Sequence, residues 1–127
     1  ADKLALIGFS RGGLLSLHYV LDNPNAMAAV VLMSPSTGGD GDITFQDALD
    51  KLNQLAIPLM VTVGANDNTS IKSQVNQLIN KLENLGKTYV ANTDYTDGNT
   101  DGGTHEWFYQ VRDEYWPDII SFLTTHL

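Results

Sequence analysis

Residues 4–13 read LALIGFSRGG, an apolar run followed by a serine and an arginine set among three glycines. The run over residues 4–9 is short and rich in Leu and Ile, which is typical of a strand buried on both faces of a parallel sheet. Residues 12–21 are apolar almost all round, which predicts a buried helix that ends before Asn23-Pro24. This part of the chain therefore predicts a strand, a tight turn and a helix in direct succession.

The turn carries a G-x-S-x-G pattern, with Ser10 between Gly8 and Gly12. Between a strand and a helix, this pattern is typical of a nucleophilic serine whose hydroxyl is lifted out of the sheet by a strained turn. Side chains at positions 8 and 12 are expected to collide with neighbouring backbone. The backbone amide of Arg11, at the start of the helix, is predicted to stabilise a developing oxyanion. The alternative is a tight turn that needs glycine and has an incidental serine.

Strand-like and helix-like segments alternate along the rest of the chain. Helical spacing of apolar residues is clearest between Ile71 and Leu85, where Gly86 follows as a stop signal. The last segment is expected to split into two helices at Trp116-Pro117. The predicted strands are residues 4–9, 28–33, 58–63 and 88–92, and the predicted helices are residues 12–21, 45–55, 71–85 and two within 105–127.

The connections between these segments are rich in Gly, Ser and Asp. Ser34 and Ser36, which flank Pro35, are interpreted as turn and cap residues, and residues 38–42 as a flexible loop. Strands that alternate with helices predict an α/β fold, in which a parallel sheet of about four strands is flanked by four to five helices.

The order of the elements also predicts an incompletely covered sheet. If consecutive strands lie side by side, right-handed crossovers put the first three helices on one face and leave the C-terminal helix for the other. Apolar surface then stays bare, and the strand over residues 4–9 becomes an exposed edge. The chain of 127 residues has room for one domain, so it offers no second domain to cover this surface. We therefore expect the surface to be covered by self-association or by a further segment.

A serine hydroxyl needs a base and an orienting carboxylate to act as a nucleophile. His105 follows the last predicted strand and its polar loop, so it is expected at the carboxyl edge of the sheet together with Ser10. Asp67 follows the strand over residues 58–63 at the same edge. The alternatives are a helix-start role for His105 and helix capping for Asp67, although Thr69 or Ser70 could cap instead. The remaining candidates have structural interpretations or lie too near His105 in sequence: His18, His126, Asp94, Asp97 and Asp101.

Three motifs in this order resemble the α/β-hydrolase family, on its dienelactone-hydrolase-like and prolyl-oligopeptidase-like side. Residues 4–13 are similar to the nucleophile strand and elbow, residues 61–67 to a strand ending in a Gly-x-x-Asp acid turn, and residues 105–108 with 119–123 to the catalytic histidine and final helix. The resemblance implies that residues 1–127 are the C-terminal catalytic half of that fold, with the N-terminal half absent. A loop with a second oxyanion donor then has no counterpart here, and losing one donor costs about 10²–10³ in turnover in a comparable enzyme.

A weaker signal lies in residues 97–102, which read DGNTDG and fit the first half of a calcium loop. Its candidate ligands are Asp97, Asn99 and Asp101. The position that should hold a bidentate glutamate is Phe108, and no helix precedes the loop. We therefore favour a polar loop that positions His105.

The composition excludes several function classes. The net charge of −8 argues against nucleic-acid binding, for which a basic face supplies most of the affinity. No run approaches the roughly 20 apolar residues that a membrane span needs. The absence of cysteine excludes disulfides and thiolate metal sites.

Taken together, the motifs predict a serine hydrolase that cleaves carboxylic esters of small molecules through an acyl-enzyme. Ser10 is the predicted nucleophile, His105 the base and Asp67 the orienting acid, and this chemistry needs no metal or organic cofactor. A serine peptidase of the same fold is one alternative. The other is a catalytically weak fragment that acts as an association module through its bare edge and face.

Overall fold

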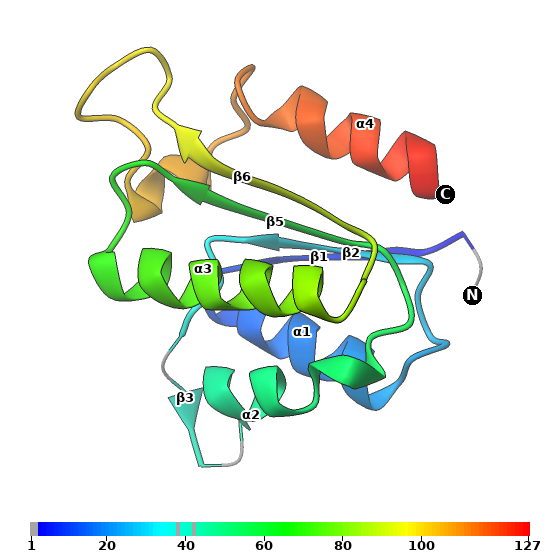
Figure 1. Cartoon of the computed structure of the whole chain (residues 1–127). Helices are drawn as coiled ribbons and strands as arrows, with labels where there is room; N and C mark the ends of the chain where they lie inside the picture. The colour runs from blue at the N-terminus through cyan, green and yellow to red at the C-terminus, as the bar shows by residue number, and fades with distance from the viewer. Residues whose placement is uncertain (1–2, 38, 42) are drawn as a thin grey trace.

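The apolar runs pair side by side in the order in which they occur along the chain. In the computed structural model, which describes residues 3–37, 39–41 and 43–127, four strands form one parallel sheet. Across the sheet they are β1 (Ala5–Phe9), β2 (Ala29–Met33), β5 (Leu59–Gly64) and β6 (Tyr89–Tyr95). The predicted parallel sheet and its α/β class are therefore confirmed (Figure 1).

Helices cover the two faces of this sheet unequally (Figure 1). One face carries α1 (Arg11–Asp22), α2 (Phe45–Asp50), the 3₁₀ turn η1 (Leu52–Gln54) and α3 (Thr69–Asn84). The other face carries α4 (Trp116–His126), which the 3₁₀ turn η2 (His105–Tyr109) precedes. Right-handed crossovers between neighbouring parallel strands impose this distribution, which agrees with the sequence prediction.

Each strand divides its side chains between two cores because successive residues point to opposite faces. Along β2, Val30 and Leu32 pack under the first three helices, whereas Ala29 and Val31 pack toward α4. The first core is mainly aliphatic. The second is aromatic, with ring centroids 4.9–6.2 Å apart among Tyr95, Trp107, Phe108 and Tyr115. This aromatic cluster packs η2 against the end of β6.

Two connections differ from the sequence prediction. The predicted flexible loop over residues 38–42 contains the short strand β3 (Gly39–Asp40), which pairs antiparallel with β4 (Ile43–Thr44) directly after the loop, while residues 38 and 42 lie outside the described residues. The predicted helix over residues 45–55 ends at Asp50 and continues as η1. Its start is well defined because the Thr44 hydroxyl accepts a hydrogen bond from the Asp47 amide at 3.0 Å.

The segment before Trp116 also differs, because it is a 3₁₀ turn and a loop where a helix was predicted. In a continuing helix, backbone amides would donate to the backbone carbonyls of this segment. Here side chains donate to two of these carbonyls instead. Arg112 Nε donates to the Trp107 carbonyl at 2.7 Å, and the Tyr115 hydroxyl donates to the Gln110 carbonyl at 2.7 Å. The prediction that a new helix opens at Trp116-Pro117 is confirmed by α4.

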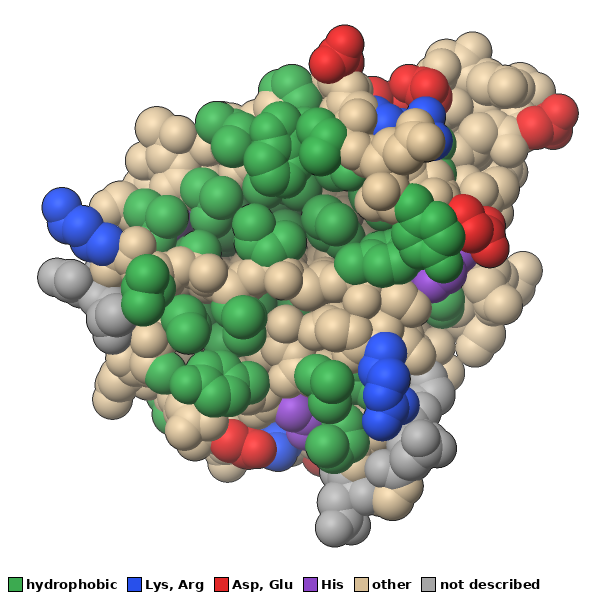
Figure 2. All heavy atoms as spheres, turned by 180° about the vertical axis from the view of Figure 1, so that it is seen from behind, with side chains coloured by type: hydrophobic (Ala, Val, Ile, Leu, Met, Phe, Trp, Pro, Cys, Tyr) green, Lys and Arg blue, Asp and Glu red, His purple; other side chains and the backbone are tan. Residues whose placement is uncertain are grey.

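Apolar surface is left uncovered along the β1 edge of the sheet. Among the described residues β1 pairs with β2 alone, and Ile7 at its centre is 41% exposed. Figure 2 shows hydrophobic side chains gathered in a broad area when the molecule is seen from behind. Exposed large apolar side chains of β1, α1, α4 and the flanking residues are Leu4, Ile7, Leu15, Tyr19, Ile120 and Leu127. Within the described part of the chain, no helix has the length and apolar character needed to cross a membrane.

Candidate active site

Ser10 lies on a sharp turn between β1 and α1. Its φ of 56° and ψ of −119° fall in a region that residues with a side chain rarely adopt. The turn is held by the Ser10 amide, which donates to the Met33 carbonyl at 3.0 Å, and by the Ser10 carbonyl, which accepts from the Ser36 amide at 2.8 Å. The strain at this serine is therefore maintained by the neighbouring strand and its exit loop.

Of the three glycines around Ser10, Gly8 is required by a close contact and Gly13 is tightly packed. A Cβ atom at Gly8 would lie 2.3 Å from the Gly12 carbonyl oxygen, as the sequence predicts. The predicted collision at Gly12 is wrong, because no other part of the described structure lies within 4 Å of a Cβ placed there. The tight position is Gly13 instead, where a Cβ would lie 3.1 Å from the Cα of Pro35. α1 thus starts directly against the loop that leaves β2.

The structure brings the three predicted site residues to the carboxyl edge of the sheet. His105 Nε2 lies 2.9 Å from Ser10 Oγ, and His105 Nδ1 lies 3.4 Å from Asp67 Oδ1. The Phe9 ring stacks on the imidazole with centroids 5.1 Å apart. The Asp67 side chain is fully buried, whereas that of His105 is 25% exposed. The carboxylate is therefore shielded while the imidazole and the serine remain reachable.

Close backbone packing fixes the acid turn against the histidine loop. A Cβ at Gly64 would lie 1.8 Å from the Gly103 carbonyl oxygen, and Gly103 itself has a φ of 75°. Asn66 joins the two segments, since its Nδ2 donates to the carbonyls of Thr100 and Gly102 at 2.7 and 2.6 Å. Glycine at positions 64 and 103 is thus needed for two chain segments to meet at backbone distance. Sequence reasoning missed Asn66, although it directly precedes the predicted acid.

Ser34 is a polar neighbour of the site that sequence reasoning interpreted as a turn residue. It directly follows β2 with a φ of 46°, and it is fully buried. Its hydroxyl donates to Asp67 Oδ2 and lies 2.6 Å from His105 Nδ1. The rule that selected Asp67 and His105, a polar residue at the carboxyl end of a strand, also selects Ser34.

Asp67 does not cap α3, which was the alternative interpretation. Asn68 is the N-cap residue, and its Oδ1 accepts from the Ser70 amide at 2.8 Å. The sequence had allowed Thr69 or Ser70 as the cap, but neither residue caps the helix. Asp67 Oδ1 instead accepts from the Asn68 amide at 2.6 Å, so both carboxylate oxygens have hydrogen-bond partners within the site.

The other histidines lie away from Ser10. His18 is buried in α1, and its Nε2 lies 2.7 Å from the Thr44 carbonyl oxygen. His126 lies at the end of α4, with its ring centroid 4.8 Å from that of Phe122. Both arrangements agree with the structural interpretations given to these residues.

Asp97 and Asn99 of the acidic loop before His105 have partners within the protein. Asp97 lies 3.6 Å from Arg112, and Asn99 Oδ1 accepts from the Asp101 amide at 3.0 Å. Across the described residues, no group of three or more His, Cys, Asp or Glu side chains is arranged to hold a metal ion. These two contacts hold the loop against Arg112 and across its own turn in front of His105.

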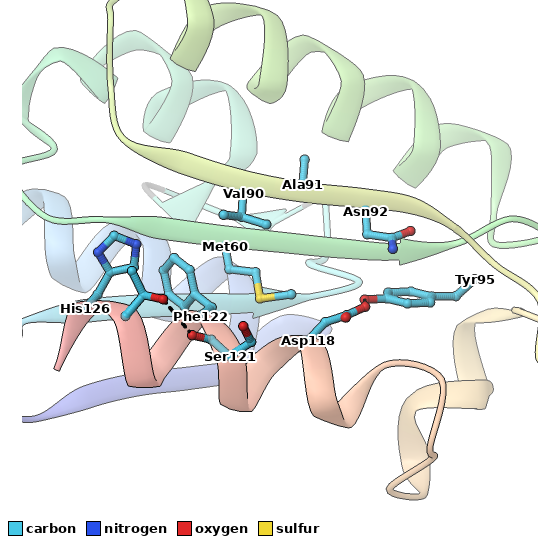
Figure 3. A pocket seen from close by; sticks show the side chains of 10 residues that line it. Met60, Val90, Ala91, Asn92, Tyr95, Asp118, Ser121, Phe122 and His126 are labelled. Atoms are coloured by element: carbon cyan, nitrogen blue, oxygen red, sulfur yellow. Dashed lines mark hydrogen bonds between the residues drawn. The ribbon is translucent and has the colours of Figure 1, made fainter.

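A cavity of about 350 Å³ lies between α4 and β6 (Figure 3). Ser10, Asp67 and His105 do not belong to its lining. Two of its polar groups pair with each other, since the Tyr95 hydroxyl donates to Asp118 at 2.6 Å. Burial, followed by this hydrogen bond, raises the pKa of Tyr95 above its ordinary value. Because Ser10, Asp67 and His105 do not line the cavity, it is separate from the candidate active site.

Comparisons with known proteins agree with this architecture. A family model described as the alpha/beta hydrolase fold matches residues 1–51, which include the elbow. A monoglyceride lipase homolog of Monkeypox virus is 39% identical over 61 residues, which are 48% of this chain and 20% of the viral protein.

Two solved structures share the fold at low sequence identity. A dipeptidyl peptidase 4 from Porphyromonas gingivalis is 16% identical with a TM-score of 0.79, and the match covers 100% of this chain and 20% of the peptidase. A protein described as a dienelactone hydrolase from Klebsiella pneumoniae is 19% identical with a TM-score of 0.74, over 98% of this chain and 52% of that protein. This chain thus spans between a fifth and half of the length of these relatives. The family match across the elbow and the shared architecture along the whole chain make this an α/β-hydrolase-fold protein.

Proposed function

We propose that this chain is a serine hydrolase that cleaves carboxylic esters of small molecules. The observation that carries the proposal is the 2.9 Å separation between His105 Nε2 and the hydroxyl of Ser10 on its strained turn. A base at hydrogen-bond distance from a serine at the start of a helix is the arrangement that serine hydrolases need. The viral monoglyceride lipase homolog and the dienelactone hydrolase further support ester substrates.

In the proposed reaction, Ser10 Oγ attacks the ester carbonyl carbon while His105 Nε2 takes the hydroxyl proton. The backbone amide of Arg11 stabilises the negative oxygen of the tetrahedral intermediate. Collapse breaks the bond to the alcohol, which leaves with the proton from His105, and the acyl group stays on Ser10. Water then attacks with His105 as base, and this releases the carboxylic acid and restores the serine.

A fluorophosphonate probe tests the nucleophile directly, since it reacts covalently with activated serines. We expect it to label wild-type protein at Ser10, and we expect Ser10→Ala to abolish labelling and His105→Ala to lower its rate by at least about 10³-fold. Ser121→Ala, which removes an exposed serine hydroxyl on α4, is the matched control and should label like the wild type. Wild-type protein that folds but does not react with the probe would refute the proposal.

A serine peptidase is the second candidate, because a peptidase shares the fold over the entire chain. Activated esters and peptide amides, assayed side by side on the same preparation, distinguish the two. Turnover of esters with little amide cleavage supports the esterase. Amide cleavage with negligible ester turnover assigns the site to peptides.

The uncovered β1 edge leads to a separate prediction, that the isolated 127-residue chain self-associates. Burial of Ile7 and its apolar neighbours against a second copy would remove them from water, and strand pairing would satisfy the open edge. We expect light scattering to report at least a dimer, and Ile7→Lys to shift it toward the monomer. Val90→Lys, at a similarly exposed position on the opposite edge strand β6, should not. A wild-type monomer at high concentration contradicts self-association, and then a further hydrolase half or another chain is the partner to seek.

A further inference from the structure

We infer that Ser34 is a positioning residue, which links Asp67 to His105 and holds the imidazole in the tautomer that the proposed reaction needs. Ser34 and Ser10 follow neighbouring strands, and both have positive φ values, 46° and 56°. The Ser34 amide donates to the Thr62 carbonyl at 2.7 Å, so the next strand holds this strained residue in place. A side-chain-bearing residue kept in such a conformation inside the protein points to a role for its side chain.

The direct contact between acid and base is too long to orient the imidazole by itself. His105 Nδ1 lies 3.4 Å from Asp67 Oδ1, beyond the usual range for a nitrogen donor and an oxygen acceptor. The Ser34 hydroxyl fills this role, with His105 Nδ1 at 2.6 Å and Asp67 Oδ2 on its other side. The Asp67 carboxylate is therefore connected to the His105 imidazole by shorter contacts through Ser34 than by the direct contact.

Counting donors and acceptors fixes the direction of each hydrogen bond. A carboxylate only accepts, so the single hydroxyl proton of Ser34 is donated to Asp67. The Ser34 oxygen is then left to accept, and His105 Nδ1 must supply the proton for that bond. With the ring proton on Nδ1, Nε2 carries the lone pair, and it is this nitrogen that faces Ser10 Oγ. Ser34 thereby couples the charge of Asp67 to the nitrogen that accepts the nucleophile's proton.

The test is Ser34→Gly, because glycine adopts a φ of 46° without cost and removes only the side chain. We read the tautomer from ¹⁵N NMR of the histidine side chains at about pH 8.5, where an ordinary imidazole is neutral. His105→Gln identifies the His105 signals. Wild-type protein should show His105 protonated at Nδ1, and in Ser34→Gly a form protonated at Nε2 should appear. The rate of Ser10 labelling should fall about 10- to 100-fold, less than for loss of a triad aspartate because the long Asp67 contact remains.

Thr62→Val is the matched control. It removes a second buried hydroxyl beside Ser34, one that has no hydrogen-bond partner among the described residues. This variant should keep the wild-type tautomer and label within about twofold of the wild-type rate. Ser34→Ala serves as a second hydroxyl deletion if the glycine variant folds poorly, as judged by circular dichroism.

A His105 spectrum that stays wholly Nδ1-protonated in the folded Ser34 variants overturns the inference, as does a wild-type ring protonated at Nε2. The effect on labelling rests on the proposed function, whereas the tautomer does not. If the wild-type protein resists the probe, but Ser34→Gly still changes the tautomer of His105 as expected, the proposed hydrolase activity is refuted. The role of Ser34 as a positioning residue then still holds.

Discussion

Asp67→Asn is expected to lower the reactivity of Ser10 by about 10³- to 10⁴-fold, the scale of loss known for the same change in a serine protease. Asp67 Oδ1 accepts from the Asn68 amide at 2.6 Å, and a backbone amide cannot reverse its role. An asparagine therefore keeps its oxygen there and turns its NH₂ group toward Ser34. Ser34 must then donate its proton to His105 Nδ1, which leaves Nε2 protonated and unable to accept from Ser10.

The measurement is the rate of fluorophosphonate labelling, together with hydrolysis of an activated ester. Asp94→Asn is the matched control, because it makes the same change of charge at an exposed position of β6. It should react like the wild type. An Asp67→Asn protein that folds and keeps the wild-type rate within about threefold would remove Asp67 from the triad.

Gly103→Ala is expected to have the largest effect on stability, a loss of about 3–5 kcal/mol in the free energy of unfolding. Its Cβ would lie 1.8 Å from the Tyr95 carbonyl oxygen and 2.9 Å from the Ala65 amide nitrogen, and these two atoms are already hydrogen-bonded to each other. The φ of 75° adds the cost of a left-handed conformation. Because Gly103 joins the acid turn to the histidine loop, the substitution should also separate Asp67 from His105.

Gly98→Ala isolates the backbone part of this effect. Gly98 lies in the same loop with a φ of 73°, but no other group of the described residues lies within 4 Å of a Cβ placed there. Urea unfolding should report a loss of about 1–2 kcal/mol for this variant. If both variants were equally stable, the close approach of the loop to β5 would not be a determinant of stability.

The parallel sheet and the helices α1, α3 and α4 could be predicted because their signals are local. Each strand is a short apolar run. The α1 segment is apolar almost all round and α3 has periodic apolar positions, and both end at recognisable stop signals. Handedness then decided which face each helix covers, since a right-handed crossover leaves no freedom once neighbouring strands are parallel. The bare β1 edge followed from the strand order, because consecutive strands that lie side by side leave the first strand at the edge.

Ser10, His105 and Asp67 could be chosen from sequence because chain order and strand direction bring the ends of parallel strands to one edge. The same rule did not tell which polar residues at that edge contact one another. Ser34 was interpreted as a turn residue, yet it lies between Asp67 and His105. Gly12 was assigned a steric role that belongs to Gly13, because the tight contact comes from Pro35 on a different strand connection.

Chain order and hydrophobic spacing were enough to specify the sheet, the side each helix takes and the edge that gathers Ser10, Asp67 and His105. Packing in three dimensions was needed for the hydrogen bonds of Ser34, because its partners lie 33 and 71 positions away along the chain. It was also needed for the backbone contact between Gly64 and Gly103. The physical reason is range: periodicity and turn chemistry act over a few residues, whereas donor direction and atomic clearance depend on groups that only the folded chain brings together.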